Sequence, residues 1–213
     1  MSGIVLAFAG ATTGPAPPPP IGSAYGGGFF AGQIGVGGVA SHNLIVGPVA
    51  SAVSASKQFK TTNTATTGTS SAIDGPTNSS NMNNASHPAA EFCEGLTIGG
   101  FSDWYLPAKN ELEVCYYNLK PTTADNVTTS GINANAIPAR ASNYTAGTPA
   151  QTSATDFRNT GAEDFQSAYY WSSTQSAVYS GTNAYRQEFS YGYQRNSAKT
   201  NQFDVRAVRR VAV

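Results

Sequence analysis

The segment GGFSDWYLPAKNELEVCYYNLK, residues 99–120, constrains the fold more than any other part of this sequence. A short apolar strand, WYL, runs directly into a helix, because Pro107 suits the first helical turn, where its missing N–H costs nothing. Strand alternation predicts that Trp104 and Leu106 point into the core and that Tyr105 points outward. The chain must therefore bury a strand together with the helix that follows it, which requires a mixed architecture of helices and sheets.

Two carboxylates accompany this strand and helix, Asp103 before the strand and Glu111 within the helix. Paired carboxylates are also what a glycosidase uses. The spacing suits caps and buried ion pairs at least as well, since Glu111 can reach back to the N–H donors that open the helix. We interpret Asp103, Trp104 and Glu111 as a folding signature rather than as a catalytic pair.

Turn-forming residues divide the rest of the chain into expected strands, loops and helices. Short strands separated by glycine turns are expected over residues 24–60, in AYGGGFFAGQI, HNLIVGPVA and SKQFK. Residues 61–84 and 121–167 have loop composition, with a single helical turn expected at SATDF. A first short helix is expected over 88–95, before the one over 107–120.

The C-terminal part is predicted to close the domain as an antiparallel meander. Its segments AYYWSST, AYRQEFSY, YGYQRN and QFDVRAVRRVAV have strand character. One face of the second segment carries Tyr185, Gln187, Phe189 and Tyr191. Such alternation indicates that one face is buried. The last segment has apolar residues on both sides, which favours a central strand covered on both faces.

Residues 1–22 are predicted to form an arm outside the domain, which then spans 23–213. The run GPAPPPPIG favours a stiff polyproline II spacer. Ahead of it, GIVLAF is strand-like and too short to stand alone, so we expect it to pair with a copy of itself or with another protein. It lacks a preceding basic segment and is shorter than the roughly 18 residues of a membrane span, so no signal peptide, anchor or membrane insertion is expected.

Charge is scarce along this chain. Charged residues make up 11% of the 213, and the formal net charge is +0, which excludes bulk attraction to nucleic acid or to an anionic membrane. No nucleic-acid partner is therefore expected. Solubility must come from Ser, Thr, Asn and Gly, and this composition, with 11% aromatic residues, is typical of extracellular, virion or surface binding proteins.

The two cysteines, Cys93 and Cys115, recur with apolar residues at helical spacing, so both are expected to face the core. We interpret them as small buried hydrophobes, with a disulfide between two packed helices as the open alternative. A metal or catalytic role has little support, because nothing else in the chain supplies a set of partners.

No metal, cofactor or catalytic set can be assembled from the sequence. The two histidines, His42 and His87, are expected in turns or caps and complete no Ser-His-Asp set. Asp74, Asp103 and Asp125 are scattered and form no recognisable calcium loop. We expect no cofactor and no metal, and the sequence leaves calcium binding open.

Three separated motifs follow one another in the second half of the chain. Their residues are, in order, Gly99, Gly100, Phe101, Ser102, Asp103, Trp104, Leu106, Pro107, Glu111 and Leu112, then Tyr170, Trp171, Ser172, Ser173 and Thr174, then Val205, Arg206, Val208 and Arg209. This order resembles a family with the pattern GG-aromatic-S/T-DW-x-LP-x-x-x-EL, YWSST and VR-x-VR. That family is the domain at the C-terminus of a bacterial collagen-like adhesin, the Lcl C-terminal type, also found in phage tail and virion proteins. The resemblance runs from about Gly26 to the C-terminus.

The resemblance implies a variant of the C-type lectin fold, related to the formylglycine-generating enzymes. The expected fold class is α+β, a C-type-lectin-like domain with two short helices and a closing antiparallel β meander, preceded by an extended Pro-rich arm. An enzyme is disfavoured, because formylglycine-generating enzymes depend on cysteines late in the chain, whereas Cys93 and Cys115 lie in the first helical pair. In this fold the C-terminal strands and their loops present a variable face on a rigid scaffold.

Residues 176–203 have the composition of a binding face, because they interleave Tyr, Asn, Ser and Arg, the mixture that paratopes use. The predicted ligand-binding residues are Tyr179, Asn183, Tyr185, Arg186, Tyr193, Arg195, Asn196 and Lys199. Residues 184–213 hold six basic and two acidic side chains, a local charge of +4, which favours acidic or sulfated glycans or phosphate-bearing surface polymers. For Arg206, Arg209 and Arg210 we favour internal ion pairs instead.

These observations predict a phage virion protein, a tail or fibre component whose lectin-like head recognises a host cell-surface glycan or protein without catalysis. It would be assembled in the host cytoplasm, released by lysis, and attached to other virion proteins through its N-terminal arm. A homotrimer is expected, since weak contacts gain strength by repetition. Two other interpretations stay open, a structural decoration or adaptor protein of the virion and a bacterial surface adhesin.

Overall fold

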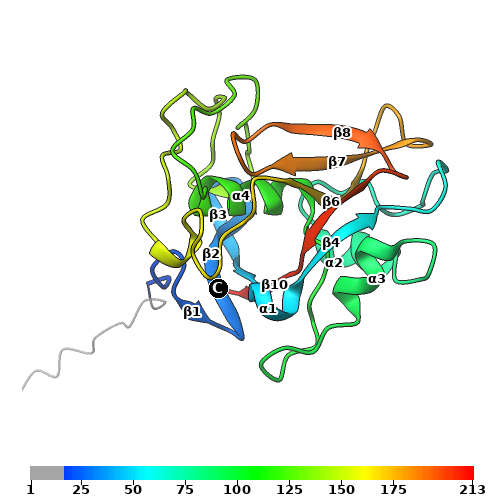
Figure 1. Cartoon of the computed structure of the whole chain (residues 1–213), viewed down its shortest axis with the longest axis horizontal. Coiled ribbons are helices and arrows are strands. Elements are labelled where there is room, and N and C mark those ends of the chain that lie inside the picture. Colours follow the sequence, from blue (N-terminus) through cyan, green and yellow to red (C-terminus); the bar gives the residue numbers. More distant parts are fainter. Residues whose placement is uncertain (1–16) are drawn as a thin grey trace, which may run out of the picture.

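The computed structural model describes residues 17–213, which form two five-stranded sheets (Figure 1). In the first sheet the strand order is β1 (Ala24–Tyr25), β2 (Gly28–Val36), β3 (Val39–Val46) and β10 (Val208–Ala212), with β5 (Ala136–Ile137) paired to β2. In the second sheet the order is β4 (Val53–Gln58), β9 (Gln202–Arg206), β6 (Tyr169–Gln175), β7 (Asn183–Glu188) and β8 (Gln194–Ala198). The expected docking strand GIVLAF lies outside the described residues, and the domain boundary at residue 22 stays a prediction.

Short helices complete an α+β fold, which confirms the expected class. They are α1 (Val49–Ala52), α2 (Gly75–Ser80), α3 (Pro88–Glu94), α4 (Lys109–Leu119) and the 3₁₀ turn η1 (Thr155–Phe157). The two expected helices are α3 and α4, and η1 is the turn expected at SATDF. The sequence did not indicate α1 or α2. α2 forms within the polar run because Asp74 accepts a hydrogen bond from the Thr77 N–H and Pro76 occupies the first turn.

The segment ahead of α4 forms a single β-bridge, between Tyr105 and Val208, in place of the expected strand, and both of its faces are covered. Trp104 and Leu106 are buried, as expected. Tyr105, expected to point outward, is only 3% exposed, because its backbone pairs with Val208 and its hydroxyl donates to Glu111 Oε1 at 2.8 Å. The outward prediction is wrong because alternation indicates which side chains share a face and not whether another layer covers the opposite face.

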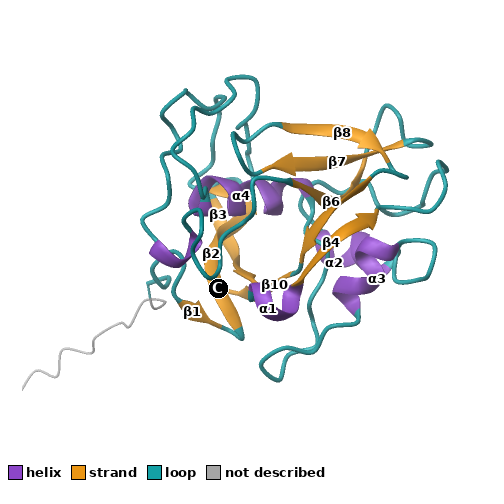
Figure 2. Ribbon diagram, viewed as in Figure 1, coloured by secondary structure: helices purple, strands orange, loops and turns teal. Residues whose placement is uncertain are grey.

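Two hydrophobic cores lie on opposite faces of the first sheet, and neighbouring residues of β3, Leu44 and Ile45, belong to different cores. α4 fills the first core, where it packs against β2 of one sheet and β7 of the other (Figure 2). Cys115 lies in this core and Cys93 in the second. Both thiols are free and buried, so the first interpretation is confirmed and the disulfide alternative is wrong. Burial raises the pKa of Cys115 to about 12.

Only part of the expected C-terminal meander forms. β6, β7 and β8 run antiparallel in sequence order. β9 then leaves them and lies between β4 and β6, pairing antiparallel with β4 and meeting β6 at a parallel bridge between Tyr170 and Asp204. β10 crosses into the first sheet and pairs with β3 at the end of the strand order, so the expected central position is correct for β9 and wrong for β10. The last strands therefore join the two sheets, and alternation alone does not indicate such a change of partner.

Three arginines of β9 and β10 fix this junction through internal ion pairs, as expected. The pairs are Arg206 with Glu163 at 2.8 Å, Arg209 with Asp103 at 2.7 Å and Arg210 with Asp74 at 3.0 Å. Both oxygens of Asp103 accept from the guanidinium of Arg209, a forked geometry that a lysine could not make. Asp103 thus ties the segment before α4 to β10, in agreement with its interpretation as a folding residue.

Candidate functional site

The predicted ligand-binding residues come from the hairpin of β7 and β8 and from the loops beside it. In the hairpin, Tyr185 lies opposite Asn196, and Arg186 lies opposite Arg195. Successive side chains of a strand point to opposite faces, so the hairpin divides the predicted set in two. Asn183, Tyr185 and Asn196 form what we call the tyrosine face, where Asn183 Nδ2 donates to Asn196 Oδ1 at 2.8 Å. Arg186 and Arg195 form the opposite, arginine face.

On the arginine face, one guanidinium is stacked and the other is exposed. Arg186 lies 3.8 Å from the centre of the Tyr169 ring, and its Nε donates to Ser197 Oγ at 2.8 Å. Its Nη1 is buried without a hydrogen-bond partner among residues 17–213. Arg195 is exposed and lies 5.8 Å from the centre of the Tyr193 ring.

Tyr179 stands on the loop between β6 and β7, where it is 58% exposed. Its carbonyl accepts from the N–H groups of Thr182 at 3.0 Å and Asn183 at 2.8 Å. Its own N–H donates to Ser176 Oγ at 3.1 Å. The backbone on both sides of this exposed ring is thus held by hydrogen bonds of a turn.

Lys199 does not belong to any exposed face, and the exposure expected for it is wrong. Its side chain is 0% exposed and donates to three acceptors, the carbonyls of Thr64 and Ser180 and Oε1 of Gln175, at 2.7 to 2.9 Å. Burial, together with the charge of Lys60, lowers the pKa of Lys199 to about 8. Composition suggested a solvent-facing lysine, but this ammonium fixes the loop that carries Tyr179.

A hollow of about 280 Å³, the Tyr185 hollow, opens beside the tyrosine face. Its lining residues are Lys109, Thr129, Ser130, Gly131, Ile132, Asn143, Tyr185 and Gln194. Lys109, the first residue of α4, holds its ammonium 5.0 Å from the centre of the Tyr185 ring. Desolvation lowers the pKa of Lys109, and the Glu113 carboxylate acts in the opposite direction. The hollow therefore combines an aromatic ring with hydroxyl, amide and ammonium groups.

Gln194 joins three elements at the Tyr185 hollow. Its amide nitrogen donates to the Lys109 carbonyl at 2.8 Å and to Gln187 Oε1 at 3.0 Å, while its backbone N–H donates to Ser130 Oγ at 3.1 Å. Sequence reasoning found Tyr185 but missed Lys109, Gln194 and the loop residues 129–132. Lys109 lies in a segment interpreted as purely structural, and the loop carries no periodic pattern that would place it beside β7.

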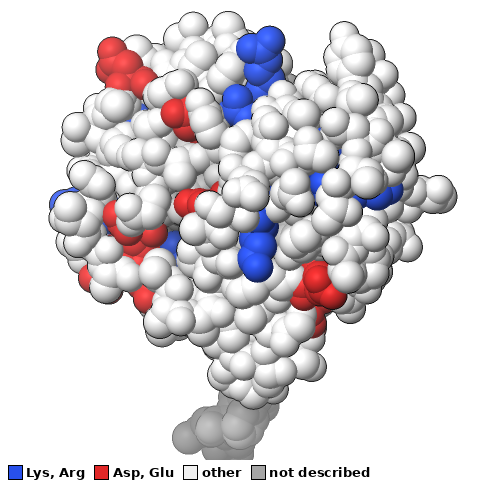
Figure 3. Space-filling model, turned by 45° about the vertical axis from the view of Figure 1, so that its right-hand side comes forward, with Lys and Arg blue, Asp and Glu red and all other residues white. Residues whose placement is uncertain are grey.

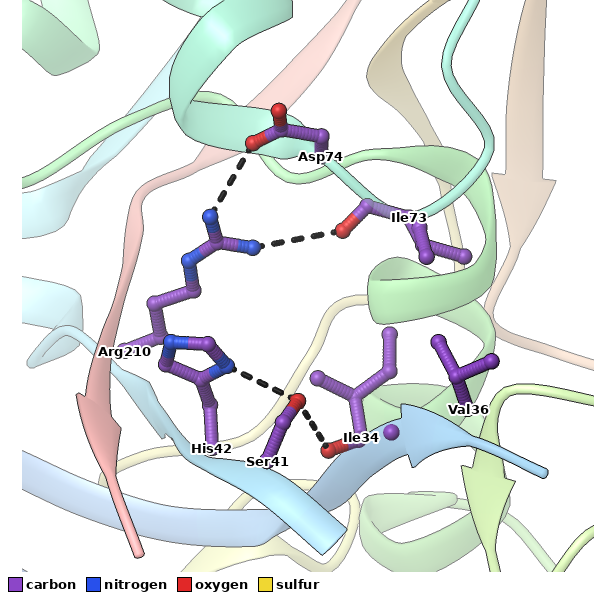
Figure 4. Close-up of a pocket in the computed structure, with 8 residues that line it drawn as sticks. Ile34, Val36, Ser41, His42, Ile73, Asp74 and Arg210 are labelled. Atoms are coloured by element: carbon purple, nitrogen blue, oxygen red, sulfur yellow. Dashed lines mark hydrogen bonds and ion pairs between the residues drawn. The ribbon is translucent and has the colours of Figure 1, made fainter. Parts of the chain in front are cut away.

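Another hollow, of about 220 Å³, is lined by Ser41 and His42 of β3, Asp74 and Arg210 (Figure 4). His42 Nδ1 lies 2.9 Å from Ser41 Oγ, whereas the Asp74 carboxylate is bound to Arg210 at 3.0 Å. Burial and the charge of Arg210 lower the pKa of His42. The aspartate thus orients the arginine rather than the histidine, which is not the order of a Ser-His-Asp relay.

Charged side chains are few and scattered on the face shown in Figure 3. Within residues 17–213, no group of three or more His, Cys, Asp or Glu side chains could hold a metal ion. No helix in the described part of the chain is long and apolar enough to cross a bilayer. His87 lies at the start of α3, the cap position expected for it.

The family model of the Lcl C-terminal domain matches residues 58–209, a stretch that contains all three motifs. The chain belongs to this family. The match begins near the end of β4, so β1, β2 and β3 precede it, although β3 pairs with β10. No curated protein matches the chain.

Proposed function

We propose that this protein is the recognition head of a phage virion, a tail or fibre component that turns its tyrosine face and Tyr179 toward the surface of a host cell. The head binds its ligand and does not transform it. It works as a homotrimer, is attached to other virion proteins by its N-terminal arm, and is released by lysis after assembly in the host cytoplasm. Resemblance to a family found in phage tail and virion proteins supports this setting.

The observation that carries the proposal is the Tyr185 hollow. A tyrosine ring, an ammonium group and several hydroxyl and amide groups converge there from α4, β7, β8 and the loop around residue 130. Sites of this kind orient a small polar ligand by hydrogen bonds while an aromatic ring supplies contact area. These groups belong to, or are bonded to, regular elements, so little ordering is needed when a ligand binds.

The support beneath the tyrosine face is rigid in the same sense. Lys199 joins the loop of Tyr179 to β6 through buried hydrogen bonds. Arg206 ties β9 to Glu163 and to the Gly47 carbonyl. A surface that must recognise a partner repeatedly benefits from such preorganisation.

Binding of the labelled protein to a panel of bacterial cells tests the proposal. We expect the full chain to bind cells of a susceptible strain, and the double variant Tyr179→Ala/Tyr185→Ala to lose at least about tenfold in affinity, as aromatic contact residues do. Val39→Ala is the matched control, since Val39 is an exposed side chain of the other sheet. Full binding by the double variant, with circular dichroism showing a native fold, would contradict the proposal.

A structural role in the virion is the second candidate function, favoured by the apolar tip of the β2–β3 hairpin. Val36 and Val39 both lie in solvent there, and exposed apolar pairs suit contact with a neighbouring subunit. Phage particles carrying Val36→Ser/Val39→Ser would then fail to assemble. Particles carrying the double tyrosine variant would assemble and fail to adsorb if recognition is the function.

A further inference from the structure

A second hollow adjoins the Tyr185 hollow on the other side of Asn143. It measures about 310 Å³, and we call it the Tyr117 hollow. Its lining residues are Tyr117, Ala139, Arg140, Ala141, Ser142, Asn143, Tyr144, Thr145 and Thr148. Asn143 lines both hollows, so a ligand that leaves one across this exposed side chain enters the other.

The two hollows repeat the same chemistry. Each contains a tyrosine, Tyr185 in one and Tyr117 in the other, beside hydroxyl and amide side chains. The volumes of the two hollows, about 280 and 310 Å³, lie just below and just above the smallest volumes usual for small-molecule sites, about 300 Å³. One hollow holds a single small polar unit, whereas the pair suits a ligand made of repeated units.

One buried carboxylate, Glu113, pairs with the cation of the Tyr117 hollow and acts through its charge on the cation of the Tyr185 hollow. Arg140 stacks 4.0 Å from the centre of the Tyr117 ring and is paired with Glu113. Glu113 is also the carboxylate that acts on Lys109 in the Tyr185 hollow. Glu113 offsets one of the two positive charges, so Lys109 is the one cation in the lining of the two hollows that has no ion pair among the described residues. Uncharged hydrogen-bonding groups dominate the lining.

Hydrogen bonds within the chain fix the wall between the hollows. The Tyr144 N–H donates to the Ser130 carbonyl at 2.7 Å, which joins the linings of the two hollows. Asn126 Nδ2 lies within 3.1 Å of the carbonyls of Thr145 and Ala146. The Tyr144 hydroxyl donates to Glu113 at 2.5 Å. A long loop fixed at these points needs little ordering to form a groove.

From this geometry we infer that the head binds an uncharged polysaccharide chain along its length, with one sugar residue in the Tyr185 hollow and a later residue in the Tyr117 hollow. The inference rests on the proposed recognition function and deepens it. Asn143 contacts the chain where it passes between the hollows. The head therefore binds an internal stretch of the polymer rather than a single terminal sugar.

The test uses surface polysaccharide from a strain that the protein binds, cut by partial hydrolysis into fractions from monosaccharide to decasaccharide. Affinity for the full chain, measured by calorimetry, should rise about tenfold or more with fragment length until both hollows are spanned and then level off. It should change little with ionic strength, because an uncharged ligand releases no counterions.

Ser142→Trp fills the Tyr117 hollow from an exposed position and should remove the gain with length while leaving monosaccharide binding intact. Thr123→Trp is the matched control, because it places the same bulk in a separate hollow beside Lys120. Equal affinity for all fragment lengths, an unchanged length gain in Ser142→Trp, binding that salt abolishes, or no binding by any fraction would overturn the inference.

The two proposals fail in different ways. If Tyr179→Ala/Tyr185→Ala abolishes cell binding and Ser142→Trp changes nothing, recognition by the tyrosine face stands and the two-hollow groove is wrong. If neither variant alters cell binding, both proposals fail together.

Discussion

Arg206 in β9 and Arg186 in β7 belong to one sheet, on either side of β6, and differ in burial and in the groups that they contact. Arg206 is 1% exposed, with its guanidinium bound to Glu163 and to backbone carbonyls. Arg186 is partly exposed, stacks on Tyr169 and keeps one nitrogen without a partner among the described residues. The guanidinium of Arg206 is thus bound on several sides by the framework, whereas that of Arg186 is held by ring stacking and one hydrogen bond to Ser197.

Both arginines lie in a stretch with a local charge of +4, yet the sequence predicted an internal ion pair for Arg206 and a ligand-binding role for Arg186. The burial of Arg206 and the partial exposure of Arg186 agree with this division. Substitutions in the framework should therefore lower the free energy of unfolding without changing ligand binding. Substitutions in the hairpin should weaken binding and leave stability nearly unchanged.

The largest effect is expected from Arg206→Met. Removing one member of a buried pair leaves Glu163 and the Gly47 carbonyl without their partner, so the free energy of unfolding should fall by about 3–5 kcal/mol. Urea unfolding followed by tryptophan fluorescence measures this loss. A change as small as that of an exposed arginine would show that the junction of β9 does not depend on the ion pair.

Glu111→Gln tests the framework through pH. Desolvation raises the pKa of Glu111 to about 7. Hydrogen bonds from the start of α4 and from Tyr105, and the charge of Arg210, lower this pKa but do not outweigh the desolvation. In the unfolded chain Glu111 loses its proton near the usual pKa of 4.5, whereas in the folded state it keeps the proton up to a pH of about 7. The contribution of Glu111 to stability therefore falls as the pH rises from about 4.5 to about 7. Unfolding free energy measured across this window should decline in the parent relative to the glutamine variant.

The parent protein must be compared with Glu111→Gln because His87 changes the stability with pH in the opposite direction to Glu111. Desolvation lowers the pKa of His87 to about 4, so its contribution to stability rises with pH between about 4 and 6.5. The difference between the unfolding free energies of the parent and the glutamine variant does not contain the contribution of His87, which both proteins share. Parallel pH profiles for the two proteins would mean that Glu111 has no raised pKa.

Much of the fold could be predicted from residues with strong local signals. Pro107 located the start of α4 to within two residues, since the helix begins at Lys109 after the cap residue Ala108. Trp104 and Leu106 were correctly assigned to the core, and the arginines of the last strands to internal pairs. Tyr105 was misassigned because alternation does not report a second covering layer. β9 and β10 were misassigned because a strand's sequence does not name its partner when the chain changes sheets.

The sequence predicted the residues of the candidate site only where the local amino-acid composition indicated a binding surface. Tyr179 and Tyr185 were found because a run rich in Tyr, Asn and Ser suggests a binding surface. Lys109 and Asn143 were missed because they reach the hollows by tertiary packing across long sequence separations. Lys199 was misassigned because lysine is usually exposed, and its buried acceptors lie in loops without pattern.

Lys199→Met tests the link between the two regions, with a smaller expected loss of about 1–3 kcal/mol for the acceptors left unpaired. The effect should be local. Amide hydrogen exchange should accelerate at Thr182 and Asn183, whose N–H groups bond the Tyr179 carbonyl. Unchanged protection at these two amides would show that Lys199 does not hold the loop.

The smallest effect on stability is expected from Arg195→Ala, because Arg195 is exposed and a surface substitution of this kind stays within about 0.5 kcal/mol. Its matched partner is Asn196→Ala, one residue along β8 and on the tyrosine face. If the tyrosine face carries recognition, Asn196→Ala weakens cell binding and Arg195→Ala leaves it unchanged. Equal weakening by both would mean that ligand wraps the edge of the hairpin, and that the division between its two faces is structural without being functional.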